Sequence, residues 1–177
     1  MTDGNVRSRY YGKYRGTVLN NLDPMQVGRL LVEVPDVTGL TPSSWAVPCA
    51  PLAGPTGPPM GVFLVPPIGA GVWVEFEQGD PNYPIWTGCR WGAPSDIPPL
   101  ARAGLPVSPS IVLQTAGQNT IVISDLPGPT GGIMLKSLTG AFILVNDVGI
   151  TISNGKGATI LMTGPTVTIN NGALTVI

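Results

Sequence analysis

Residues 132–169 read GIMLKSLTGAFILVNDVGITISNGKGATILMTGPTVTI, and this stretch decides the fold. Within it the segment Gly132–Leu135 returns as Gly149–Ile152 and again as Thr166–Ile169, so the pattern repeats every 17 residues. Each copy carries two aliphatic residues at positions i and i+2, which point to the same side of a β-strand. Repetition at a fixed period is typical of solenoids and fibres. The sequence therefore predicts a chain of short strands that presents one apolar side.

The same pattern extends over residues 111–177, where eight short apolar segments start 10, 12, 10, 7, 10, 7 and 7 residues apart. Gly, Asn, Asp and Pro separate them, and these residues favour tight turns. Strands this short, with so few charges, cannot enclose a core within one narrow ribbon. A single-chain parallel β-helix is the alternative, but its coils usually need more residues per turn. We therefore predict that three copies wind together into an intertwined trimeric β-helix over residues 111–177.

The predicted core of that trimer consists of the paired aliphatic residues of six segments. These are Ile121, Ile123, Ile133, Leu135, Ile143, Val145, Ile150, Ile152, Ile160, Met162, Val167 and Ile169. The sequence then ends on apolar residues, so three copies would present a blunt hydrophobic end, and exposed apolar surface usually marks a partner site. We predict that Leu174, Val176 and Ile177 bind a tip protein; the alternative is that the three ends pack on one another.

The first half of the chain has a different pattern. Five strand candidates occupy residues 14–19, 28–35, 45–50, 72–77 and 84–89. The first two read as a hairpin, because Asn20–Pro24 between them favours a turn. In the fourth, Val72, Val74 and Phe76 alternate with Trp73 and two glutamates, which predicts one packed and one exposed face. Five short strands in about 80 residues suit a small closed barrel.

Composition supports an all-β fold. The 177 residues include 24 Gly and 20 Pro, which leave little room for long helices, and a hydrophobic fraction of 43% argues against disorder. Residues 95–110 are rich in Pro and lack a periodic pattern, so we predict a semi-rigid linker there. The predicted organisation is an N-terminal arm (1–13), a barrel domain (14–94), the linker (95–110) and the β-helix (111–177).

Charge and motifs exclude several functions. The net charge is −1 and the nine Lys and Arg form no run, so we expect no nucleic-acid or membrane binding. No secretory signal opens the sequence, and Pro66 and Pro67 interrupt its most apolar stretch. Without an export signal, we expect Cys49 and Cys89 to be reduced, buried thiols, with a disulfide as the alternative.

We expect no enzyme, no cofactor and no metal. The sequence has no histidine, which excludes a Ser-His-Asp triad and the common zinc sites. Glu75 and Glu77 have the strand spacing of a glycosidase carboxylate pair, but they fall on the predicted polar face, where nothing raises a carboxylate pKa. We therefore predict ordinary solvated side chains.

Residues 15–92 resemble the oligomer-binding (OB) fold domain of phage baseplate assembly protein V and of the VgrG spikes of type VI secretion. The carrying motifs are Arg15–Val18, Asn21–Pro24, Gly28–Asp36, Trp45–Pro48, Pro66–Glu77 and Gly79–Pro81, followed by Pro84 and Gly88. The repeat tail resembles the trimeric β-helix of the same family, so the likeness spans most of the chain.

The resemblance implies a homotrimer whose barrels sit on a baseplate hub protein while the β-helix is driven through a target cell envelope by sheath contraction. It also implies a small PAAR-type protein at the tip and a location in a tail baseplate or equivalent particle, assembled in the bacterial cytoplasm. The lysozyme domain, the fused hub domain and the His-bearing metal tip of other members do not fit this chain, which is too short for the first two and has no histidine.

Two alternatives belong to other functional classes. Small five-stranded barrels often bind single-stranded nucleic acid, and Trp45, Trp73, Trp86 and Trp91 could stack on bases. Because the charge is neutral, we interpret these tryptophans as core and interface anchors. A trimeric carbohydrate-binding tail fibre also fits the repeat, but such a fibre normally ends in a knob with exposed aromatic residues.

Overall fold

The chain forms two units, Met1–Gly92 and Ala93–Ile177. The computed structural model describes residues 8–54 and 58–176, so part of the predicted N-terminal arm lies outside the described residues. Within the arm, Tyr10 donates its backbone N–H to the Gly79 carbonyl at 2.9 Å and packs against the core of the first unit. The Pro-rich segment contains two 3₁₀-helices and belongs to the second unit.

The first unit is a curled five-stranded sheet. Its elements are β1 (Tyr14–Asn20), β2 (Leu31–Glu33), α1 (Pro35–Thr38), β3 (Val47–Pro48), β4 (Ala53–Gly54), β5 (Met60–Gly61), β6 (Gly71–Phe76), the 3₁₀-helix η1 (Glu77–Gly79) and β7 (Pro84–Arg90). The strand order is β2-β1-β6-β7-β3, while β4 and β5 pair separately. The antiparallel β1–β2 pair is the predicted hairpin. The prediction of an all-β chain that begins with a five-stranded sheet is confirmed.

The barrel closes through the segment that contains β3. Leu30, just before β2, exchanges two backbone hydrogen bonds with Ala46, at 2.7 and 3.0 Å, and β3 pairs in parallel with β7. The predicted strand over 45–50 was too long, because only Val47–Pro48 is regular strand. Prolines at 48 and 51 have no N–H to donate to a ladder, so the pairing stops within two residues.

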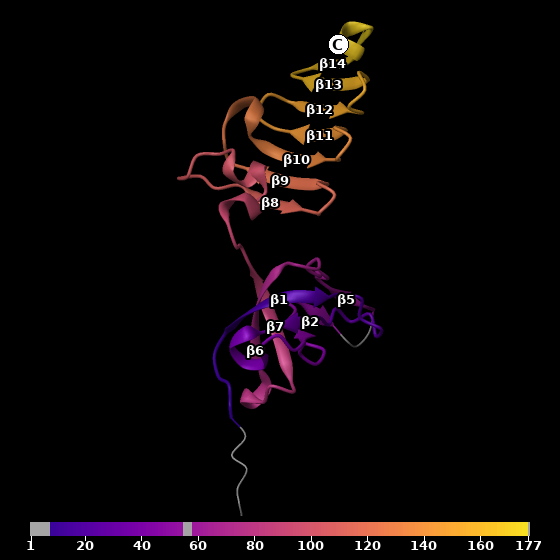
Figure 1. Cartoon of the computed structure of the whole chain (residues 1–177). Helices are drawn as coiled ribbons and strands as arrows, with labels where there is room; N and C mark the ends of the chain where they lie inside the picture. The colour runs from indigo at the N-terminus through magenta and orange to yellow at the C-terminus, as the bar shows by residue number, and fades with distance from the viewer. Residues whose placement is uncertain (1–7, 55–57, 177) are drawn as a thin grey trace, which may run out of the picture. The chain divides into compact units, whose positions relative to one another are not determined.

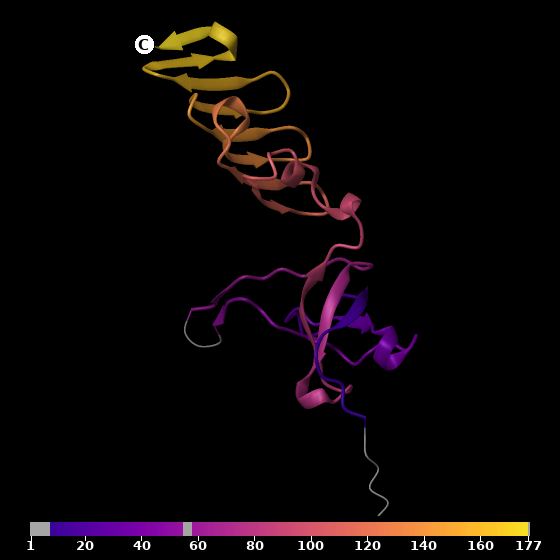
Figure 2. The ribbon, with the colours of Figure 1, turned by 90° about the vertical axis from the view of Figure 1, so that its left-hand side faces the viewer.

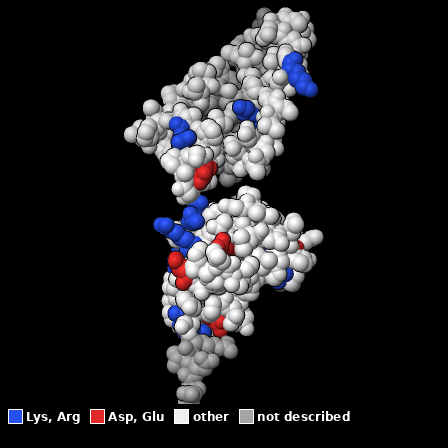
Figure 3. Space-filling model, viewed as in Figure 1, with Lys and Arg blue, Asp and Glu red and all other residues white. Residues whose placement is uncertain are grey.

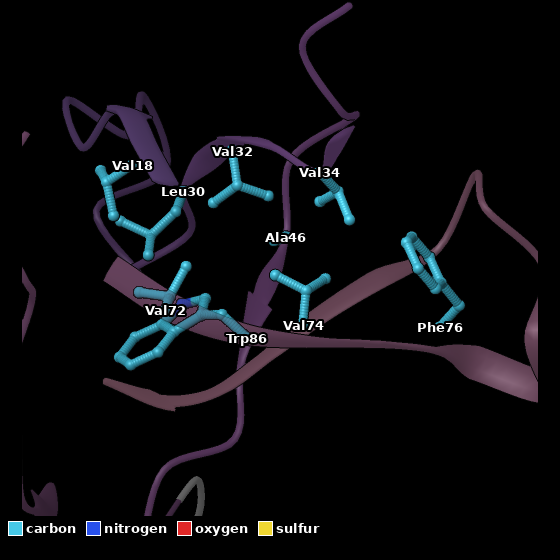
Figure 4. Close-up of a cluster of buried hydrophobic side chains, with 9 residues drawn as sticks. All are labelled: Val18, Leu30, Val32, Val34, Ala46, Val72, Val74, Phe76 and Trp86. Atoms are coloured by element: carbon cyan, nitrogen blue, oxygen red, sulfur yellow. The ribbon is translucent and has the colours of Figure 1, made fainter. Parts of the chain in front are cut away.

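An apolar core fills the first unit, and Figure 4 shows its nine side chains gathered between the strands. They are Val18, Leu30, Val32, Val34, Ala46, Val72, Val74, Phe76 and Trp86. The predicted alternation in β6 is confirmed, since Val72, Val74 and Phe76 are all buried. Trp86 also donates its indole N–H to the Gly28 carbonyl at 3.0 Å, which satisfies the one polar group on that ring.

The loop between β1 and β2 is held by one buried carboxylate. Asp23 accepts backbone N–H groups from Met25, Val27 and Arg29 at 3.0 to 3.2 Å, and the Arg29 guanidinium at 2.6 and 3.0 Å. Arg29 lies over the Trp45 ring, 5.4 Å from its centroid. These donors, Arg29 foremost, hold the pKa of Asp23 well below its usual range. The loop is therefore ordered by charge-assisted hydrogen bonds rather than by apolar packing.

The second unit is a single antiparallel sheet whose strands follow one another in chain order (Figure 1). Its elements are η2 (Pro94–Asp96), η3 (Pro99–Arg102), β8 (Ile111–Gln114), β9 (Thr120–Ser124), η4 (Gly128–Thr130), β10 (Gly132–Lys136), β11 (Phe142–Val145), β12 (Ile150–Ser153), β13 (Thr159–Thr163), β14 (Thr166–Ile169), η5 (Asn170–Gly172) and β15 (Leu174–Val176). Each 17-residue repeat is one pair of strands, so the pattern is that of a meander and not of a single-chain parallel β-helix.

We predict that Leu30→Ala lowers the free energy of unfolding of the first unit by about 2–5 kcal/mol, because Leu30 is fully buried and nothing else can fill its space. All four tryptophans of the chain precede Ala93, so tryptophan emission during urea unfolding reports on this unit alone. Leu40→Ala is the matched control, since Leu40 is 86% exposed and its truncation costs less than about 0.5 kcal/mol. Equal losses in the two variants would contradict the described core.

We predict that Asp23→Asn destabilises the first unit at pH 7 and removes part of its acid sensitivity. The pKa of Asp23 is lower in the folded chain than the ordinary value of 3.8. Its contribution is therefore complete above that value and is lost as the pH falls below it. Urea midpoints measured from pH 7 down to pH 2 should fall less steeply below pH 4 in the variant. A variant whose midpoints run parallel to the wild type would exclude this role for Asp23.

Candidate functional site

Two ladders of aliphatic side chains run across the whole sheet of the second unit. The register places two residues of every strand opposite their counterparts in the next strand, and paired residues share a face. The first ladder is Ile111, Ile123, Ile133, Val145, Ile150, Met162, Val167 and Val176. The second ladder is Leu113, Ile121, Leu135, Ile143, Ile152, Ile160, Ile169 and Leu174. We call this surface the ladder face.

Most of the ladder face is exposed in the described part of the chain. In β9 the residues on the opposite face, Thr120, Val122 and Ser124, are buried, whereas Ile121 and Ile123 are 42% and 41% exposed. The helix η3 lies against β8. The chain thus covers the opposite face of its first strands, and most ladder residues remain exposed from β8 to β15. A continuous apolar surface of this extent marks an interface.

All twelve residues that the sequence analysis proposed as trimer core lie on the ladder face. The proposed trimer core did not include Ile111 and Leu113. Both lie on the ladder face, where they are 62% and 58% exposed. Their spacing at i and i+2, the same as in the other strands, could have identified them as members of this face. Of the predicted tip residues, Leu174 and Val176 are the last members of the two ladders, in β15, whereas Ile177 lies outside the described residues.

Tight turns keep successive strands in this register. Asn146 accepts backbone N–H groups from Val148 and Gly149 at 3.0 and 3.1 Å, and Asn154 does the same for Lys156 and Ala158. Gly132, the first residue of β10, has a φ of +93°, and a Cβ there would overlap the Val145 carbonyl oxygen. Glycine at position 132 is therefore required by both conformation and space.

The two candidate glutamates of the first unit lie in different elements, Glu75 in β6 and Glu77 in η1. Glu75 is paired with Lys13 at 2.7 Å on the surface, and Glu77 lies outside the strand in η1. The structure contradicts the prediction of buried thiols, because Cys49 and Cys89 are both free but exposed. Cys49 follows β3, where regular pairing has ended, and Cys89 lies on the outward side of β7. Within residues 8–54 and 58–176, no cluster of His, Cys, Asp or Glu could hold a metal ion.

The tryptophans are used in different ways. Trp86 is buried in the barrel core, Trp45 lies beneath Arg29, and Trp91 is 62% exposed. Figure 3 shows few acidic and basic side chains on the visible face, and on the first unit acidic side chains lie near the basic ones. Trp86 is therefore a core residue, as the sequence predicted. Among the described residues, no helix is long and apolar enough to cross a membrane.

Comparison with known families agrees with both halves of the structure. Residues 14–91 match the family model of the type VI secretion system/phage-baseplate injector OB domain. Residues 110–175 match that of the phage baseplate V C-terminal trimerisation domain. No curated protein matches the chain. The five-stranded sheet is therefore an OB domain, and the sheet with the ladder face is a trimerisation domain.

Proposed function

We propose, from the premise that this chain belongs to the phage baseplate V family, that it is the central spike of a contractile tail or injection apparatus. The trimerisation domain makes it a homotrimer. The single observation that supports the proposal best is the ladder face, most of whose residues stay exposed in the described part of the chain. The family is structural, and the role we propose is mechanical rather than enzymatic.

Three ladder faces turned toward a common axis would bury the sixteen ladder residues of each copy, two from each of eight strands. Completing the burial of a half-exposed aliphatic side chain stabilises the assembly by roughly 1 kcal/mol. Summed over three copies, this gain is large compared with the cost of association. Such an assembly would resist dissociation under load, as a spike that pierces an envelope must.

Further parts of the proposal concern the ends of the assembly. In β15, Leu174 and Val176 are each 55% exposed, and three such strands would offer an apolar platform for a small PAAR-type tip protein. The OB barrel is the part we propose to attach to a baseplate hub, since its core is complete without partners. The complex would then reside in a tail baseplate or an equivalent particle.

The first test is the mass of the protein in solution. The chain has a mass of 18.3 kDa, so we predict about three times this value by light scattering for the full chain. A variant that ends at Pro109 lacks all ladder strands and should associate only weakly. A stable full-length monomer would refute the spike and leave the single-stranded nucleic-acid binder as the better interpretation of the barrel.

A second test compares two neighbouring residues of β12. Ile152→Lys places a cation on the ladder face, where three copies would bury three unpaired charges, so we predict loss of the trimer. Thr151→Lys is the matched control on the opposite face and should remain trimeric, because its ammonium group stays in water. Light scattering at the same chain concentration checks both variants. Dissociation of the Thr151 variant alone would place the interface on the other face.

A further inference from the structure

A long part of the OB domain carries no charge and exposes large apolar side chains. Residues 37–74, 38 in all, contain no Asp, Glu, Lys or Arg. Leu52, Met60, Phe63 and Leu64 of this span are between 49% and 71% exposed. Scattered apolar residues on a surface are ordinary, but a cluster without any charge marks an interaction site. The core of the OB domain does not use these side chains.

These residues lie on a two-stranded arm that leaves the barrel. Strands β4 and β5 pair antiparallel, and Val62 donates its backbone N–H to the Leu52 carbonyl at 3.0 Å. In Figure 2 the two strands extend away from the barrel sheet. We define the apolar arm by its described residues, 50–54 and 58–64.

The base of the apolar arm is fixed to the barrel. Cys49 donates its backbone N–H to the Trp86 carbonyl at 3.0 Å, and the Asn21 side chain donates to the Pro66 carbonyl at 3.1 Å. Val65 packs against the barrel core. Prolines at 51, 58 and 59 restrict the backbone further, so little conformational entropy is lost when the arm is covered. The apolar arm is thus a pre-formed element whose exposed side chains lie outside the buried core of the barrel, and of these Phe63 lies close to Gly28.

The same OB domain carries an apolar groove of about 580 Å³. Trp45, Val47, Pro48, Cys49, Tyr83 and Ile85 supply most of its lining. Glu77 is the one carboxylate in the lining. The other lining residues are Ser44, Asn82 and Pro84. The volume is sufficient for several large aliphatic or aromatic side chains. The described residues of the arm do not line the groove of their own chain: Cys49, just before the arm, lies in the groove wall, and β4 and β5 pair with each other.

We propose that the apolar arm of each copy docks in the apolar groove of the next copy in the trimer, so that the three OB domains form a closed ring. This inference rests on the proposed trimer. A head-to-tail contact between unlike surfaces closes when three copies are related by a threefold axis. The trimerisation domain holds the three OB domains on one assembly, which raises their effective concentration. In the trimer, a second copy of the chain is therefore always available to fill the groove.

Crosslinking between the arm and the groove tests this proposal, because Cys49 is a native, exposed thiol in the groove wall. In full-length protein with Cys89→Ser, the change Met60→Cys adds a thiol near the end of the arm. We expect a short bis-maleimide to convert the trimer to a three-chain product on a denaturing gel. Adding Cys49→Ser leaves one thiol per chain, and this variant should give single chains. Leu40→Cys, an exposed position outside the arm, should give single chains.

The outcomes separate this inference from the proposed function. Light scattering of each variant before crosslinking shows whether the trimer is intact. Intact trimers that yield only single chains would overturn the docking of arm in groove while leaving the spike in place. If, in such trimers, the Met60→Cys thiol becomes protected only on addition of a baseplate extract, the arm docks on another protein. A two-chain product from the Cys49→Ser variant, which has one thiol per chain, would instead indicate contact between two arms and would also overturn the proposal.

Discussion

Hydrophobic burial of the ladder face is the interaction on which the rest of the second unit depends. Two aliphatic residues per strand, aligned by an antiparallel register, form a surface that one sheet cannot cover by itself. The turns, the glycine at Gly132 and the asparagine hydrogen bonds all serve to keep that register. A slip of one residue would turn both ladders to the opposite face, so the turns determine the interface as directly as the aliphatic residues do.

The two units solve the burial problem in different ways. The OB domain closes its sheet, through Leu30 and Ala46, around nine buried side chains, and so completes a core within one chain. The second unit keeps its sheet open and leaves the apolar face for other copies. The first unit is therefore expected to retain its fold as a monomer, whereas the second gains its core by association. This division suits a family in which one domain is an injector OB domain and the other trimerises.

The sequence predicted those features that rest on periodicity. The i and i+2 aliphatic pairs identified twelve members of the ladder face, and the alternation in residues 72–77 identified the buried side of β6. The sequence analysis did not predict how short β3 is. The pairing of β3 depends on prolines and on barrel closure between residues far apart in the chain. The exposure of Cys49 and Cys89 was also missed, since the burial of a cysteine depends on tertiary packing that no local pattern encodes. The apolar arm escaped notice because residues 50–64 have no strand or helix period.

The apolar arm and the ladder face differ in what they can contribute to one assembly. The ladder face is repetitive, and its residues at one level resemble those at the next, so aliphatic packing alone discriminates poorly between registers that differ by a whole repeat of 17 residues. The arm and the groove are single, non-repeating features of each copy. A ring of OB domains closed by arm and groove would fix the register in which the three chains enter the trimerisation domain. Aligned in this way, each strand of one copy would meet its equivalents in the others, and the repetitive face would bury its full length.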